Sequence, residues 1–165
     1  MAERVYNVLF LCTGNSARSI MAECAINRWG QGRFEGFSAG SHPKGKIHPM
    51  TLRLLERLNY RTQHLRSKSW DEFAQRKGPP LDFVFTLSDT AAGEAPPTWP
   101  GHPITAHWHC ADPESYEDAT EHRLALIRAR TELERRLRVF ANLPVRSLDR
   151  LSLQAQVDAL GSSHN

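Results

Sequence analysis

The feature that most constrains this chain is an apolar run, VLFL at residues 8–11, that ends at a cysteine. Only small or polar residues separate Cys12 from Arg18, and a helical spacing of apolar residues begins directly after them. A short apolar run is typical of a buried strand, and a segment of small polar residues is typical of a turn. The segment therefore predicts a strand, a tight loop and the N-terminus of a helix, in that order.

This arrangement predicts an anion site beside Cys12. The backbone N–H groups of such a loop point inward, and the helix dipole adds partial positive charge. Arg18 offers a planar guanidinium that can hold two oxygens of a phosphate, arsenate or sulfate ion. Positive potential also favours the nucleophilic thiolate form of Cys12, to which Ser19 can donate a hydrogen bond. A nucleophile, an anion cradle and a charge clamp thus lie within residues 12–19.

The composition indicates a soluble globular chain. Of 165 residues, 40% are hydrophobic and 24% are charged, which is ordinary for such proteins. Three cysteines, an odd number, do not make a secreted disulfide framework, so we expect a cytoplasmic location. The MAER start at residues 1–4 is unlike a signal peptide, and no apolar run is long enough to span a bilayer. The net charge of +3 suits anionic substrates, but no nucleic-acid motif accompanies it, so neither nucleic acid nor membrane is an expected partner.

Strand and helix patterns alternate along the rest of the chain. Strands are predicted at residues 33–40, 81–87 and 104–108, and helices at residues 19–29, from Pro49, from Ser69, at 115–142 and at 147–160. Residues 88–101 are expected to form a loop, and residues 161–165 to be disordered. Such alternation predicts an α/β fold in which ligands bind at the carboxyl ends of parallel strands. The loop after Cys12, the loop from Ser88 and Asp112 would all lie at that end.

Several short motifs follow one another along the chain: CTGNSARS at residues 12–19, MAE at 21–23, FSAG at 37–40, HP at 48–49, TL at 86–87 and DP at 112–113. Together they resemble the low-molecular-weight protein tyrosine phosphatase superfamily, and most closely its arsenate reductases. The tyrosine phosphatases usually place a proline directly after the Arg-Ser pair, where this chain has Ile20. The resemblance implies a four-stranded parallel sheet flanked by helices. Residues 1–143 would form the phosphatase-like catalytic domain, and residues 144–165 a C-terminal helical tail.

The resemblance also implies a role for each residue of the loop. Cys12 would be the nucleophile, Arg18 the oxyanion binder and Ser19 the residue that stabilises the thiolate. The anion would be held by the loop amides of Thr13, Gly14, Asn15, Ser16, Ala17 and Arg18. The side chain of Asn15 would also shape the loop. Asp112 would be the general acid, which agrees with the need of a departing hydroxide or alkoxide for a proton.

The chain departs from the resemblance at the second thiol that arsenate reduction requires. Cys12 would attack arsenic, and a second thiol would then attack Cys12 so that arsenite leaves. Thioredoxin-coupled relatives carry further cysteines where this chain has Ser88 and Ala95. Cys24 is expected to be a buried apolar residue, and Cys110, two residues before Asp112, is the candidate resolving thiol. Our preferred prediction is an external thiol, such as glutathione with a glutaredoxin-like protein.

Two alternatives stay open. Without resolving cysteines, the site could hydrolyse a cysteinyl-phosphate with water, which is the chemistry of a low-molecular-weight protein tyrosine phosphatase. Aromatic residues follow the Asp-Pro pair in those phosphatases, and Tyr116 is the only nearby candidate here. The other alternative is a non-catalytic oxyanion-binding or redox-sensing module, which the tail after Pro144 suggests.

No bound cofactor and no metal ion are predicted. His102, His107 and His109 lie close together in the sequence, but no carboxylate or cysteine pair at zinc-site spacing accompanies them. We interpret them as ordinary surface or loop histidines. Some reductases that the chain resembles hold a potassium ion near the loop, and the matching residues here are Asn15, Glu23 and Ser38.

Overall fold

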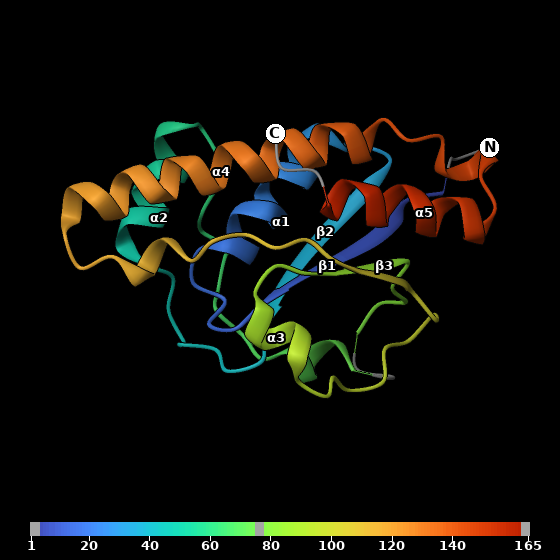
Figure 1. The fold of residues 1–165 in the computed structure, drawn as a ribbon, viewed down its shortest axis with the longest axis horizontal. Helices are drawn as coiled ribbons and strands as arrows, with labels where there is room; N and C mark the ends of the chain where they lie inside the picture. Colours follow the sequence, from blue (N-terminus) through green and yellow to red (C-terminus); the bar gives the residue numbers. More distant parts are fainter. Residues whose placement is uncertain (1–3, 75–77, 163–165) are drawn as a thin grey trace.

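The computed structural model describes residues 4–74 and 78–162, which form a four-stranded parallel sheet with helices packed on it (Figure 1). The strands are β1 (Tyr6–Cys12), β2 (Phe34–Gly40), β3 (Phe83–Thr86) and β4 (Ile104–His107), in the order β2-β1-β3-β4. The helices are α1 (Arg18–Trp29), α2 (Pro49–Arg57), α3 (Asp89–Gly93), α4 (Ala119–Ala141) and α5 (Arg150–Gly161). Short 3-10 turns are η1 (Trp70–Phe73), η3 (Pro113–Ser115) and η4 (Val145–Ser147). The predicted fold class is confirmed.

Side chains alternate along β1 and build a core on each face of the sheet. Val8 and Phe10 point to the face covered by α1, α2, α4 and α5, whereas Leu9 and Leu11 point to the opposite face. That second face is covered by η1 and α3 (Figure 1). Because all the strands are parallel, the carboxyl ends of β1, β3 and β4 lie at one edge. The loops that follow these strands therefore meet there.

The C-terminal segment packs against the edge strand β4. The Trp108 indole Nε1 donates a hydrogen bond to the Val157 carbonyl at 2.9 Å, and the Gln154 amide donates to the Thr105 carbonyl at 2.8 Å. Leu153 and Val157 are buried in the core. The helical tail is therefore held to the sheet by hydrogen bonds as well as by apolar contacts.

Several predicted boundaries are wrong, and local capping explains them. The long helix begins at Ala119, because Asp112 caps the separate turn η3 and Asp118 then caps α4. The expected loop at 88–101 contains α3, which Ser88 caps by accepting a hydrogen bond from Ala91 N–H. The segment from Ser69 is only the short turn η1, and Gly161 belongs to α5.

The ends of the chain are described only in part. Residues 1–3 and 163–165 lie outside the described residues, so the expectations about a leader and about C-terminal disorder fall largely there. Within residues 4–74 and 78–162, no helix combines the length and apolar character needed to cross a membrane.

Candidate active site

The loop that joins β1 to α1 is shaped by hydrogen bonds to its own carbonyl groups. The carbonyls of Thr13 and Gly14 accept hydrogen bonds at 2.9 Å from the backbone N–H groups of His42 and Lys44, and the Ser16 carbonyl accepts from His48 at 3.1 Å. Since the N–H and C=O groups of a trans peptide point in opposite directions, carbonyls that turn outward leave the loop amides facing inward. This is the arrangement that an anion cradle requires.

Asn15 holds the turn of the loop and fixes the direction of a hydrogen-bond relay. Its φ of +48° lies in the left-handed region, which asparagine tolerates. The Lys68 backbone N–H can only donate, and it donates to Asn15 Oδ1 at 2.8 Å. Asn15 Nδ2 therefore faces Ser19 and donates to Ser19 Oγ at 2.7 Å. The Ser19 proton is left for Cys12 Sγ, 2.9 Å away, so the relay ends on the sulfur as the thiolate requires.

Arg18 and Asp112 come from different elements and meet beside Cys12. Arg18 Nη1 donates to the Cys110 carbonyl at 3.0 Å, and Arg18 Nη2 lies 3.9 Å from Asp112 Oδ1. Asp112 is held at the start of η3, because the same Oδ1 accepts from Glu114 N–H at 2.9 Å. A guanidinium that can bind an anion and a carboxyl group that can transfer a proton thus border the same space.

That space is a pocket of about 430 Å³ that reaches Cys12, Arg18 and Asp112. Its outer wall carries His42, Lys44, Asp89, His109 and Glu114, and none of the described residues that line it is Phe, Tyr or Trp. Tyr116 is 41% exposed and is not part of the lining. The walls therefore suit a small charged oxyanion and offer no aromatic surface for a phenyl ring.

Glu114 holds the loop through hydrogen bonds, and the sequence analysis did not identify this residue. Its carboxylate accepts hydrogen bonds from the Ser16 hydroxyl and, at 3.0 Å, from the Lys44 ammonium. Burial works to raise the pKa of Glu114, but the hydrogen bonds from Ser16 and Lys44 outweigh it, so that pKa lies below its usual value. The only local signal was its place two residues after Asp112.

The two remaining thiols differ from Cys12 in their surroundings. Cys110 borders the pocket, but none of its surface is exposed, and burial raises its pKa to about 12. Burial likewise raises the pKa of Cys24, in α1, to about 12. A thiol must ionise to act as a nucleophile. Both side chains are therefore protonated near neutral pH, and Cys24 fits the buried apolar role predicted for it.

The two positions that lack cysteine hold residues with other roles. The Ser88 hydroxyl caps α3 and contacts the Thr13 hydroxyl at 3.0 Å, so it links the third strand to the Cys12 loop. Ala95 lies exposed beyond α3. Neither side chain can take part in thiol exchange.

The residues associated with potassium by resemblance are all buried, and two of them, Glu23 and Ser38, are hydrogen-bonded to each other. Ser38 Oγ donates to Glu23 Oε1 at 2.6 Å, and Asn15 lies in the relay above. The Lys68 ammonium is 4.0 Å from the same Glu23 oxygen, and burial lowers the Lys68 pKa despite the attraction of Glu23. The Lys68 ammonium is therefore a cation that already lies near the Glu23 carboxylate.

Comparison with known proteins gives the family of the chain. A family model for the low molecular weight phosphotyrosine protein phosphatase matches residues 7–155. The chain is 31% identical over 135 residues to an arsenate reductase from Halalkalibacterium halodurans, covering 81% of this chain and 94% of that protein. The arsenate reductase of Bacillus subtilis (strain 168) is also 31% identical over 135 residues, with the same two coverages.

Solved structures share the fold. Arsenate reductase from Archaeoglobus fulgidus superposes with a TM-score of 0.63 at 24% identity, over 82% of this chain and 99% of that one. A thioredoxin-dependent arsenate reductase from Corynebacterium glutamicum gives 0.62 at 26% identity, over 85% and 62%. The Escherichia coli K30 tyrosine phosphatase Wzb, in complex with sulphate, gives 0.62 at 16% identity, over 84% and 97%. The chain belongs to the low-molecular-weight phosphotyrosine protein phosphatase family, and within this family it groups with the arsenate reductases.

Proposed function

We propose that the protein reduces arsenate to arsenite through a covalent adduct on Cys12 that an external thiol resolves. The observation that carries this proposal is the surroundings of Cys12. Its sulfur receives the Ser19 hydrogen bond at 2.9 Å and borders a polar pocket shared with Arg18 and Asp112. The other thiol along that pocket, Cys110, is fully buried.

In the first half of the reaction, the Cys12 thiolate attacks the arsenic of arsenate. A sulfur–arsenic bond forms and one arsenic–oxygen bond breaks, and the departing oxygen takes a proton from Asp112 and leaves as water. Arg18 and the loop amides hold the remaining oxygens, whose charge they stabilise. Arsenic is still in its oxidised state after this step.

In the second half, an external thiolate attacks Cys12 Sγ. A sulfur–sulfur bond forms, and the electron pair of the sulfur–arsenic bond stays on arsenic, which leaves as arsenite. A second external thiol then attacks the mixed disulfide and frees Cys12. Two thiols are thereby oxidised to one disulfide for each arsenate reduced. Glutathione, used directly or through a glutaredoxin-like protein, is the donor we propose, and the cytoplasm is the compartment that supplies it.

An internal resolving role for Cys110 is the competing version of this step. Its raised pKa and full burial count against attack on Cys12, because a buried protonated thiol is a poor nucleophile. Movement of the segment that carries Cys110 would be needed to bring its sulfur to the adduct as a thiolate. The external route does not require Cys110 to ionise.

The second candidate function is phosphate-ester hydrolysis. The same nucleophile, guanidinium and carboxyl group could form and hydrolyse a cysteinyl-phosphate, and the serine at position 88 and alanine at 95 favour a route that needs no second thiol. The absence of aromatic residues among the described pocket lining makes an aryl phosphate a poor fit. Hydrolysis is therefore expected to be the weaker activity.

Two assays on one preparation distinguish these functions. Arsenite release is measured with glutathione and glutaredoxin, and p-nitrophenyl phosphate hydrolysis is measured in parallel. We expect arsenite release that is lost in Cys12→Ser, together with weak hydrolysis. Robust hydrolysis without arsenite release would overturn the proposal in favour of the phosphatase.

A further inference from the structure

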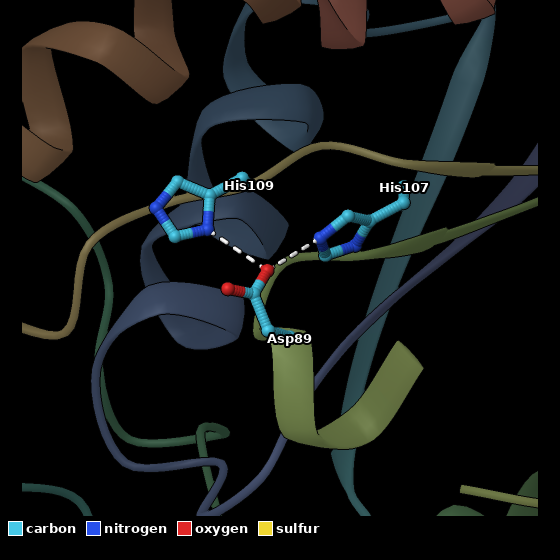
Figure 2. A group of neighbouring side chains, drawn as sticks. All are labelled: Asp89, His107 and His109. Atoms are coloured by element: carbon cyan, nitrogen blue, oxygen red, sulfur yellow. Dashed lines mark hydrogen bonds and ion pairs between the residues drawn. The ribbon is translucent and has the colours of Figure 1, made fainter. Parts of the chain in front are cut away.

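Three side chains from the carboxyl ends of β3 and β4 come together at the rim of the pocket. Asp89 begins α3, directly after the third strand, while His107 ends β4 and His109 follows two residues later. Asp89 Oδ1 lies 2.8 Å from His107 Nε2 and 3.0 Å from His109 Nδ1 (Figure 2). Both imidazole nitrogens thus approach the same carboxylate oxygen (Figure 2). The sequence interpretation noticed both histidines but no carboxylate, because Asp89 lies far from them along the chain.

The surroundings of His107 place its Nε2 on the side of Asp89. Its Nδ1 lies 3.0 Å from the Thr86 carbonyl oxygen, which can only accept, and 2.8 Å from the Thr86 hydroxyl, which can donate or accept. When the ring carries its hydrogen on Nδ1 and donates it to the carbonyl, Nε2 has a lone pair free for a metal ion, 2.8 Å from an oxygen of the Asp89 carboxylate.

The arrangement has the features of a metal site. Metal-binding histidines usually donate their second ring N–H to a backbone carbonyl or carboxylate, and the Thr86 carbonyl lies where His107 Nδ1 can donate to it. Two imidazole nitrogens and one carboxylate oxygen, all within 4.8 Å of one another, are three ligands of the kind that divalent transition metals take, with positions left open for water. We propose that Asp89, His107 and His109 bind a divalent transition-metal ion, for which Zn²⁺ is the probe.

The location joins this site to the Cys12 pocket without overlapping its nucleophile. Asp89 and His109 line the same pocket as Cys12. Ser88, next to Asp89, contacts the Thr13 hydroxyl of the loop at 3.0 Å. A bound ion would lie at the pocket rim and would replace the negative charge of a lone carboxylate there with a net positive charge. The three side chains are exposed, so an ion can enter and leave freely.

Zinc binding to the full chain tests the proposal. The Cys12→Ser background removes the thiolate that would itself bind zinc, and Cys24 and Cys110 are buried. Zinc affinity is measured by competition with a chromophoric chelator. We expect one equivalent to bind with micromolar affinity. Adding His107→Ala or Asp89→Asn should weaken binding by at least about tenfold, since each removes one ligand of three.

His102→Asn is the matched control, because His102 is exposed, lies outside the cluster and has a φ of +52° that asparagine accepts. Its zinc affinity should equal that of the background. Circular dichroism verifies that each variant is folded, and His109→Ala replaces any that is not. Two results would overturn the proposal. One is that the Cys12→Ser chain binds no zinc at concentrations up to about 100 times the expected dissociation constant. The other is that one equivalent of zinc still binds after both ligand substitutions.

Discussion

At Cys12, a single backbone donor sets the direction of three successive hydrogen bonds. The Lys68 N–H orients the Asn15 amide, the amide orients the Ser19 hydroxyl, and the hydroxyl proton points at the sulfur. Hydrogen bonds to a charged group are worth about 1.5–3 kcal/mol. The relay therefore gives the thiolate form of Cys12 a stabilisation that a neutral thiol would not receive.

Removing the last member of this relay tests its role. Ser19→Ala should slow the alkylation of Cys12 by iodoacetamide roughly tenfold at neutral pH, which corresponds to about 1.4 kcal/mol of lost hydrogen-bond stabilisation. The measurement is the rate of Cys12 alkylation, followed by mass spectrometry. Ser152→Ala, on the exposed face of α5, is the control and should leave the rate unchanged. An unchanged rate in Ser19→Ala would mean that the hydroxyl does not support the thiolate.

At the scale of elements, the site depends on how closely β2 approaches the loop after β1. Cys12 pairs with Gly40 in the sheet register, and a Cβ at Gly40 would lie 2.6 Å from the Thr13 carbonyl oxygen. Backbone cannot yield as a flexible side chain does. Only glycine at the end of β2 therefore lets the loop keep its shape.

Gly40→Ala should consequently disturb the anion cradle. A displacement of about 1 Å in a catalytic group lowers the rate about a hundredfold, so we expect at least a tenfold loss of arsenite release. Gly93→Ala serves as the control, because a Cβ there meets nothing within 4 Å. Equal activity of the two variants would contradict the account of the loop.

The turn η3 is tied to the loop by Glu114, and this tie depends on pH. The Glu114 pKa is lower in the folded chain than in the unfolded chain, so its contribution to stability is complete above about pH 4.3 and is lost as the pH falls through the folded-state value. Denaturant unfolding across this acidic range should show a smaller loss of stability for Glu114→Gln than for the wild type. Glu35→Gln, at an exposed position of β2, should behave as the wild type. A Glu114→Gln slope as steep as the wild-type slope would contradict this assignment.

Over the whole molecule, α5 covers the β4 edge that carries the proposed metal ligand His107 at its end. Leu153 is 7% exposed and packs in the core, whereas Leu151, on another face of the same helix, is 83% exposed. The last helix therefore contributes to the stability of the sheet through one face only.

Two leucine substitutions separate these faces. Leu153→Ala should lower the free energy of unfolding by about 2–4 kcal/mol, and Leu151→Ala should change it by less than about 0.5 kcal/mol. Urea unfolding followed by tryptophan fluorescence measures both. Similar effects for the two variants would show that the tail is not packed as described.

Local patterns predicted most of this molecule, and contacts between distant residues account for the rest. The strand, loop and helix around Cys12 could be recognised because alternation and small residues are local signals. The brace from Glu114 to Ser16 joins residues 98 positions apart, and Asp89 meets His107 only because β3 and β4 are neighbours. Such pairs follow from strand order, which one sequence does not reveal residue by residue. The roles of Cys12, Arg18, Ser19 and Asp112 remain predictions that the geometry supports.

The most direct test of the central claim is turnover by a chain that keeps only Cys12. The variant Cys24→Ala/Cys110→Ala, verified as folded by circular dichroism, is given arsenate, glutathione and glutaredoxin, and arsenite and glutathione disulfide are counted. The account predicts wild-type turnover with one arsenite per disulfide. A folded variant that releases no arsenite, while the wild type does, would contradict resolution by an external thiol.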